Sequence, residues 1–227
     1  MKTILLAITL LLLLTFTSTL ITHAQATEQP SDDTIRKFIL ANPEIILESL
    51  KRYEEKVEAG TKTIEQQIIK KELALIATNN TSYIGGNPNG SITLIEFLDY
   101  KCGYCKKAHG QILELINSNP EIRFIVKEFP ILGDESLIAS KASVAVFLDQ
   151  GSKAYRTFTE KLLKYNGRIT IDSIQNLLKS IGGETEDIQK LMESKAVYNI
   201  LNSNYNLAKK LKIRGTPTFI IGTEIVR

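Results

Sequence analysis

Residues that commonly bind metals or haem are scarce in this sequence of 227 residues. It contains two cysteines, two histidines and two methionines. A structural zinc site takes four ligands, usually from two Cys/His pairs, and the one grouping in this chain, Cys102, Cys105 and His109, supplies three. A c-type haem site needs a histidine directly after the second cysteine, but residue 106 is lysine. The sequence therefore predicts neither an intrachain zinc site nor a covalently attached haem.

Blocks of like charge and internal repeats are absent as well. The formal net charge is +3, from 28 Lys and Arg against 25 Asp and Glu. Binding to nucleic acid needs clustered basic residues that neutralise phosphates. The sequence therefore predicts no nucleic-acid partner.

The N-terminus has the pattern of a secretory signal peptide. Lys2 precedes an apolar stretch over residues 4–14, and Ala24-Gln25-Ala26 then places small residues at both recognition positions of a cleavage site. We predict a signal peptide over residues 1–26, cleavage before Thr27, and export to the periplasm. An uncleaved membrane anchor is the alternative. The roughly 200 residues that remain suit one globular domain with an appendage.

Residues 27–84 are predicted to form a helical appendage. A capping cluster at Ser31 leads into a short helix over 34–40, and Asn42-Pro43-Glu44 starts the next helical segment. Because Gly60 lowers helix stability, we expect a break there and two helices. We interpret the appendage as an oligomerisation arm that makes the protein a homo-oligomer; packing on its own domain is the alternative. Its apolar residues follow in alternating steps of four and three, as in a coiled coil: Ile46, Leu50, Tyr53, Val57, Gly60 and Ile64.

The two cysteines form a single Cys-x-x-Cys sequence, Cys102-Gly103-Tyr104-Cys105. The apolar segment 92–100 before it is predicted to be a buried strand, and segment 106–116 after it a helix. Unpaired N–H groups at a helix N-terminus favour the thiolate of the first cysteine. A structural disulfide that closes so small a loop would add little stability. We therefore predict that Cys102 and Cys105 form a redox-active disulfide pair.

The rest of the chain completes a mixed α/β pattern. Residues 85–90 are rich in Gly, Asn and Pro, and mark the start of a domain over 85–227. A second strand is predicted over 122–129, helical periodicity dominates 134–206, and a last strand lies within 213–222. The order strand, helix, strand, helical block, strand is typical of a mixed α/β fold.

Three segments together resemble the thioredoxin superfamily, and in particular its DsbA-like branch with a helical insertion, here at about 134–206. The segments are 96–106, 127–133 and 215–219. The resemblance implies a thioredoxin fold and thiol–disulfide oxidoreductase activity without a cofactor. Residues 42–46 resemble the oligomerisation arm of the suppressor-of-copper-sensitivity C proteins. In that group the arm assembles a trimer, so we expect a trimer or a dimer.

The resemblance implies a role for each residue around the cysteines. Cys102 would be the nucleophile that forms a mixed disulfide with the substrate, and Cys105 would resolve it. Thr216 and Pro217 would form a loop with a cis peptide bond that lies against the thiols and binds substrate. Tyr104 would cover the site or supply an apolar contact.

Glu96 lies in an otherwise apolar strand, six residues before the first cysteine. A carboxylate buried beneath the thiols would accept the proton that Cys105 must lose; a solvent-facing Glu96 is the alternative. By resemblance Lys127 would be its partner, because an unpaired buried charge is costly. Glu128 is the alternative acid, since adjacent strand residues face opposite ways. We expect His109 to be a structural or surface residue.

The residues between the cysteines bear on the direction of the reaction. Gly103-Tyr104 is also the pair in the periplasmic disulfide isomerase DsbC, and a threonine before the cis-proline is isomerase-like, whereas strongly oxidising DsbA enzymes carry Pro-His between the cysteines. We therefore expect a disulfide isomerase or reductase that acts on exported proteins with cysteines and has a membrane redox partner. The alternatives are a DsbA-type oxidase and a non-enzymatic Cu(I) carrier, for which only Met192 remains as a further soft ligand.

The sequence stops at Arg227, whereas relatives continue into a closing helix. We expect Gly222-Thr223 to turn into a short strand, and the C-terminal helix of the fold to be missing.

Overall fold

The computed structural model describes residues 31–78, 81–183 and 185–226. The chain divides into two compact units, residues 1–57 and 58–227. In the first unit, helix α2 (Asp32–Ala41) is capped by Ser31, whose hydroxyl accepts a hydrogen bond from the Thr34 N–H at 3.3 Å. The predicted signal peptide and its cleavage site lie outside the described residues.

Helix α3 (Glu44–Thr78) is a single continuous helix, so the predicted break at Gly60 is wrong. A glycine in an exposed helix interior costs only about 1 kcal/mol relative to alanine, and several helical turns lie on either side of this one. In the second unit the helix is anchored by Ile69, which is buried in the domain core. The flanking turns and this anchor outweigh the cost of the glycine.

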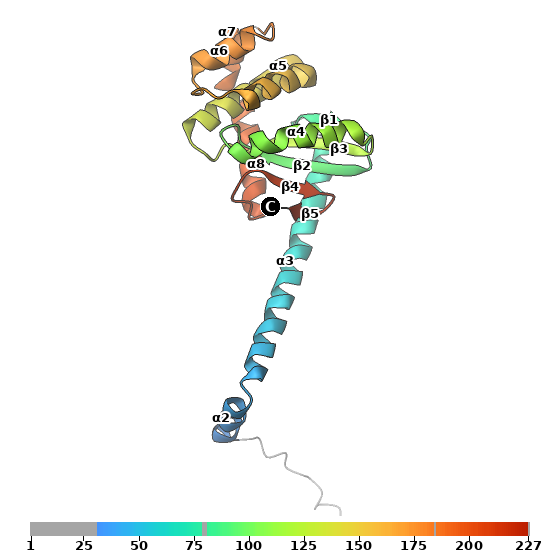
Figure 1. Ribbon diagram of the computed structural model, residues 1–227, viewed down its shortest axis with the longest axis vertical. Helices are drawn as coiled ribbons and strands as arrows, with labels where there is room; N and C mark the ends of the chain where they lie inside the picture. The colour runs from blue at the N-terminus through green and yellow to red at the C-terminus, as the bar shows by residue number, and fades with distance from the viewer. Residues whose placement is uncertain (1–30, 79–80, 184, 227) are drawn as a thin grey trace, which may run out of the picture. The chain divides into compact units, whose positions relative to one another are not determined.

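Within the described residues, a five-stranded sheet with the order β1-β3-β2-β4-β5 forms the centre of the second unit (Figure 1). Strands β2 and β3 are parallel, and the other pairs are antiparallel. The predicted mixed α/β fold is confirmed. Strand β1 is an addition to the prediction, because its glycines are typical of a turn. The strands are β1 (Ile84–Gly86), β2 (Ile92–Leu98), β3 (Ile122–Glu128), β4 (Thr218–Ile221) and β5 (Glu224–Val226).

The predicted helical insertion is confirmed as a series of helices between β3 and β4. Its first helix bends at Gly151, where a φ of 77° suits glycine better than other residues. Figure 1 shows α4 along the sheet and α5 to α7 stacked beyond it. In the described part of the chain, no helix combines the length and apolar character that a membrane span requires. The helices are α4 (Gly103–Ser118), α5 (Asp134–Lys164), α6 (Ile171–Lys179), α7 (Thr185–Met192) and α8 (Lys195–Lys210).

Alternation along β2 separates two apolar clusters. Leu94 and Leu98 belong to the cluster that includes the cysteines and α5. Ile95 and Phe97 belong to the cluster on the other face, together with Leu207 of α8. Because side chains alternate along a strand, the even-numbered residues of β2 lie on the sheet face that packs under the cysteines.

Strands β4 and β5 form a hairpin at the end of the described chain. Gly222 occupies the turn with a φ of 60°, and Ile221 pairs with Glu224. The Gly222 N–H also donates a hydrogen bond to the Thr93 carbonyl oxygen at 2.9 Å, which fastens the hairpin to β2. The predicted turn into a short strand is therefore confirmed.

Gly86 lets β1 approach β3 closely, and we expect its replacement to destabilise the fold. Its φ is 64°, and a Cβ there would lie 2.5 Å from the Ile122 carbonyl oxygen. Gly86→Ala should lower the free energy of unfolding in urea by roughly 2–4 kcal/mol. Gly182→Ala is the matched control, since its φ is 74° but no atom lies within 4 Å of the added carbon. A loss of about 1 kcal/mol is expected there, and equal losses in the two variants would contradict the close approach.

Candidate active site

The two cysteines lie at the start of α4, directly after the loop that follows β2. Cys102 is the N-cap residue, with φ −72° and ψ 114°, and Cys105 lies in the first turn. Both are free thiols; Cys105 is fully buried, whereas Cys102 keeps 6% of its surface exposed. An N-cap side chain lies beside the unpaired N–H groups of the first turn, which favour negative charge. Cys102 is therefore the more accessible thiol, and Cys105 is shielded behind it.

The loop with the cis-proline packs directly against Cys102. The peptide bond between Thr216 and Pro217 is cis, as predicted. Cys102 Sγ donates a hydrogen bond to the Thr216 carbonyl oxygen at 3.0 Å. Strand β4 begins directly after this loop and pairs with β2, with Thr218 opposite Phe97. The sheet thereby holds together two residues that lie 114 positions apart in the sequence.

Asp99, which the sequence analysis missed, holds the loops around the cysteines. Its Oδ1 accepts hydrogen bonds from the Lys101 N–H at 2.8 Å and from the Ser136 hydroxyl at 2.7 Å. Its Oδ2 accepts from the N–H groups of Ile131 and Leu132 at 2.8 and 3.0 Å. One buried carboxylate therefore ties the end of β2 to the loop after β3 and to α5. The available sequence signal is an aspartate at the end of an apolar strand, three residues before the first cysteine.

Glu96 is buried on the sheet face that carries the cysteines, so the solvent-facing alternative is wrong. Burial raises the pKa of Glu96 to about 8, and the negative charge of Glu128 adds to the shift. Burial also raises the pKa of the Cys105 thiol far above its ordinary value, and the charges of Cys102 and Glu96 raise it further. A carboxyl group with a pKa near neutrality is suited to accept and return a proton. Glu96 is thus coupled electrostatically to the thiol that needs a base.

Glu128, the alternative acid, is buried on the same face. Its Oε1 accepts hydrogen bonds from the hydroxyls of Tyr100 and Tyr155, both at 2.6 Å, and its Oε2 accepts from Ser140 at 2.8 Å. Burial raises the pKa of Glu128 to about 7, and the three hydroxyl donors oppose the shift. These donors hold Glu128 in place, and its charge acts on Glu96.

Lys127 does not pair with Glu96, contrary to the prediction. Its ammonium nitrogen lies 2.7 Å from a carboxylate oxygen of Glu72 in α3. The strand register explains this pairing: Lys127 lies opposite Phe97, whereas Glu96 lies opposite Val126. Lys127 and Glu96 therefore extend from opposite faces of the sheet. The buried lysine is balanced by a carboxylate of α3 and does not face Glu96.

Two further side chains of α4 differ in their surroundings. Tyr104 is 73% exposed, and the Lys107 ammonium lies 5.6 Å from its ring centroid. His109 is half-buried, burial lowers its pKa, and its Nε2 has no hydrogen-bond partner among the described residues. It lines a cavity of about 300 Å³ that Glu96 also lines. Tyr104 therefore presents an exposed aromatic ring two residues after Cys102, whereas His109 borders the cavity that the buried Glu96 also lines.

Metal ligands are not clustered in the part of the chain that the structure describes. No group of three or more His, Cys, Asp or Glu side chains is placed there to hold a metal ion. Met192 is buried in the apolar cluster of the helical insertion. The Cu(I) alternative therefore depends on the two thiols alone.

Comparison with known proteins agrees with this geometry. Residues 78–227 match the family model described as Thioredoxin. The thiol-disulfide exchange protein alpha-DsbA2 from Wolbachia pipientis is 31% identical, with a TM-score of 0.65 over 72% of this chain and 88% of that chain. ScsC from Proteus mirabilis in a compact conformation is 26% identical, with a TM-score of 0.64 over 85% of this chain and 94% of that chain. A probable disulfide bond formation protein D from Bacillus cereus is 22% identical over 151 residues, which are 62% of this chain and 69% of the relative.

Replacing Asp99 tests how strongly one carboxylate holds the loops of the site. We expect Asp99→Asn to lower the free energy of unfolding by roughly 3 kcal/mol, because an amide nitrogen would face N–H groups that now donate to an oxygen. Ser136→Ala removes a single hydrogen bond and should cost about 1 kcal/mol. Urea denaturation of the two variants measures the difference. If Asp99→Asn loses no more stability than Ser136→Ala, the carboxylate does not have this role.

Proposed function

The chain belongs to the thioredoxin family and is a DsbA-like thiol–disulfide oxidoreductase, and we propose that it acts as a disulfide isomerase and reductase on exported proteins. The observation that carries the proposal is the hydrogen bond from Cys102 Sγ to the Thr216 carbonyl oxygen, beside the cis-proline. It places the more accessible thiol against the loop on which a substrate peptide would lie. The roles of Thr216, Pro217 and Tyr104 in holding that peptide are part of the proposal.

The first step forms a mixed disulfide. The Cys102 thiolate attacks one sulfur of a substrate disulfide, the substrate S–S bond breaks, and the other substrate sulfur leaves with the electron pair and takes up a proton. In isomerisation, a different thiol of the substrate loses its proton, and its thiolate attacks the substrate sulfur of the mixed disulfide. Cys102 is released as a thiolate, the substrate carries a different disulfide, and no net oxidation has occurred.

Cys105 completes the reductase branch. Glu96 takes the proton of the Cys105 thiol, and the resulting thiolate attacks Cys102 Sγ. The bond between Cys102 and the substrate breaks, and the second substrate sulfur leaves and is protonated. The substrate has gained two electrons, and the enzyme is left with a Cys102–Cys105 disulfide. A membrane redox partner that supplies two electrons would restore the two thiols.

The residues around the thiols support the isomerase over the oxidase. Gly103 and Tyr104 separate the cysteines, and the exposed Tyr104 ring offers an apolar surface to a partly unfolded substrate. Disulfide oxidase is the second candidate, because the Bacillus cereus relative is named a disulfide bond formation protein. The two candidates use the same residues and differ in the direction of electron flow.

Apolar side chains of the first unit support self-association. We propose that they make the protein a dimer or trimer, and that the predicted signal peptide directs it to the periplasm. Solvent-exposed apolar residues on two amphipathic helices favour association with like helices. They are Ile35, Phe38, Leu40, Ile45, Ile46, Leu47, Leu50, Tyr53 and Val57.

The pH dependence of resolution tests the role of Glu96. Only ionised Glu96 can accept a proton, so the rate of resolution should rise with pH and level off above pH 8, the region of its pKa. Glu96→Gln should remove this inflection and slow resolution at pH 8 by roughly tenfold or more. Single-turnover stopped-flow measurement of the second thiol released from a peptide disulfide follows this step.

Lys127→Met is the control for that experiment. Lys127 lies on the opposite sheet face with Glu72, so the variant should keep the inflection of the unmodified protein. An unchanged profile in Glu96→Gln, or a profile lost in Lys127→Met, would contradict the assignment of Glu96 as the proton acceptor.

Reactivation of scrambled ribonuclease tests the direction of the reaction. We expect the reduced protein to restore ribonuclease activity catalytically, and Cys102→Ala to abolish this activity, because no mixed disulfide can form. Cys105→Ala should accumulate mixed disulfides with the substrate. Stoichiometric oxidation of reduced ribonuclease without reactivation of the scrambled form would identify an oxidase instead.

A further inference from the structure

A basic pocket lies at the end of α8, where the chain leads into the cis-proline loop. Its volume is about 260 Å³. One wall is aromatic, with the ring centroids of two side chains 6.3 Å apart, and the rim carries three cationic side chains. The residues that line it are Phe129, Tyr205, Lys209, Lys212, Ile213 and Arg214.

The cations of this pocket have no acidic partner in the described part of the chain. The ion pairs found there involve other lysines and arginines. Lys209 lies in the last turn of α8, where a cation complements the helix dipole, and this alone accounts for its position. Lys212 and Arg214 lie beyond the helix and are exposed. Their charges are therefore available to an anionic ligand.

Lys212 occupies a backbone position that glycine would fill more easily. Its φ is 53°, and it follows the C-cap Leu211. The Ile213 N–H donates to the Ala208 carbonyl oxygen at 2.8 Å, and the Lys212 N–H donates to Lys209 at 3.2 Å, as at many helix ends where glycine is preferred. A lysine in this left-handed conformation is strained. A lysine at a position that suits glycine is explained if its positive charge contributes to ligand binding.

The short separation of Lys212 and Arg214 from Thr216 suggests that their charges act on a bound substrate. Arg214 is two residues and Lys212 four residues before Thr216, whose carbonyl oxygen contacts Cys102 Sγ. Their backbones therefore lie within about 7 and 14 Å of Thr216, which is the span of two to four extended residues. We propose that the pocket binds an acidic side chain of the substrate, two to four residues from the cysteine that Cys102 attacks. This proposal rests on the proposed function, and it gives the enzyme a preference for acidic segments.

Peptides that differ only near their cysteine test the preference. Each carries one cysteine as a mixed disulfide with thionitrobenzoate, and either glutamate, glutamine or lysine at the positions two to four residues away. Attack by Cys102 on the peptide sulfur releases thionitrobenzoate, which is followed by absorbance. At low ionic strength we expect the glutamate peptide to react about fivefold faster than the glutamine peptide. The lysine peptide should react more slowly than both, and added salt should reduce the differences.

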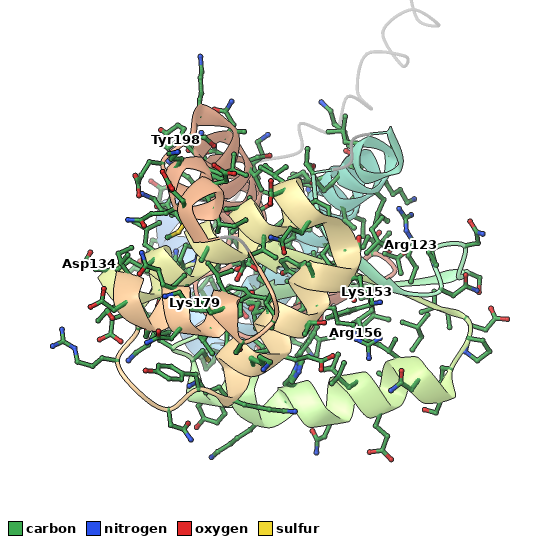
Figure 2. The ribbon with its side chains drawn as sticks, turned by 90° about the horizontal axis from the view of Figure 1, so that it is seen from above. Arg123, Asp134, Lys153, Arg156, Lys179 and Tyr198 are labelled. Atoms are coloured by element: carbon green, nitrogen blue, oxygen red, sulfur yellow. The ribbon has the colours of Figure 1, made fainter. Side chains whose placement is uncertain are left out.

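Variants locate the preference in the pocket. Lys212→Glu and Arg214→Glu should remove or reverse the ratio of glutamate to glutamine rates. Lys153→Glu, which makes the same charge change on α5 beyond the kink at Gly151 (Figure 2), should leave the ratio unchanged. Lys212→Gly should lose part of the preference while its melting temperature stays equal or rises, because the backbone strain is relieved.

The outcomes separate this proposal from the function on which it rests. Equal rates for the glutamate and glutamine peptides, with release that still requires Cys102, would overturn the acidic preference and leave the thiol chemistry intact. A preference that persists in both Lys212→Glu and Arg214→Glu would overturn the pocket as its source. Release that does not require Cys102 would contradict the proposed function itself.

Discussion

The hydrogen bond from Cys102 Sγ to the Thr216 carbonyl oxygen joins two segments that only the sheet can bring together. Strand β4 delivers Thr216 to the cysteines because it pairs with β2, the strand that precedes them. Asp99 holds the loop before Cys102 in place, because its carboxylate accepts hydrogen bonds from the Lys101 N–H and from the segment after β3. A Cys-x-x-Cys sequence alone would supply the thiols but not the cis-proline loop that packs against Cys102. The reactivity of the thiols therefore depends on the tertiary fold.

The sheet also separates the buried charges of the domain. Glu96 and Glu128 lie on the face that carries the cysteines. Burial raises the pKa of each carboxyl, and the negative charge of Glu128 raises the pKa of Glu96 further. Lys127 lies on the opposite face, where Glu72 of α3 neutralises it. Had the lysine paired with Glu96, the attraction would have kept that carboxyl ionised to lower pH. The observed arrangement instead keeps a carboxyl beneath Cys105 that can exchange a proton near neutral pH.

Features that depend on local pattern or on a recognisable motif can be predicted from the sequence. The strand before the cysteines and the helical insertion follow from periodicity, whereas the cis bond before Pro217 follows from the resemblance to the thioredoxin superfamily. The structure confirms these three features. The redox role of Cys102 and Cys105 stays a prediction. Features that depend on partners far away in the sequence were not predicted. The pairing of Lys127 with Glu72 requires the packing of α3, although the alternation of β2 and β3 already places Lys127 and Glu96 on opposite faces. The continuity of α3 through Gly60 depends on an anchor at Ile69, and β1 depends on pairing with β3 rather than on its own residues.

The central claim is that Cys102 is the nucleophile and that the buried Cys105 reacts only afterwards, when it resolves the mixed disulfide. Brief alkylation of the fully reduced native protein, followed by peptide mapping, tests this claim most directly. The burial of Cys105 and the position of Cys102 at the start of α4 predict that the label is found on Cys102 and that Cys105 is labelled only after unfolding. Comparable labelling of the two thiols in the native protein, or faster labelling of Cys105, would contradict the account.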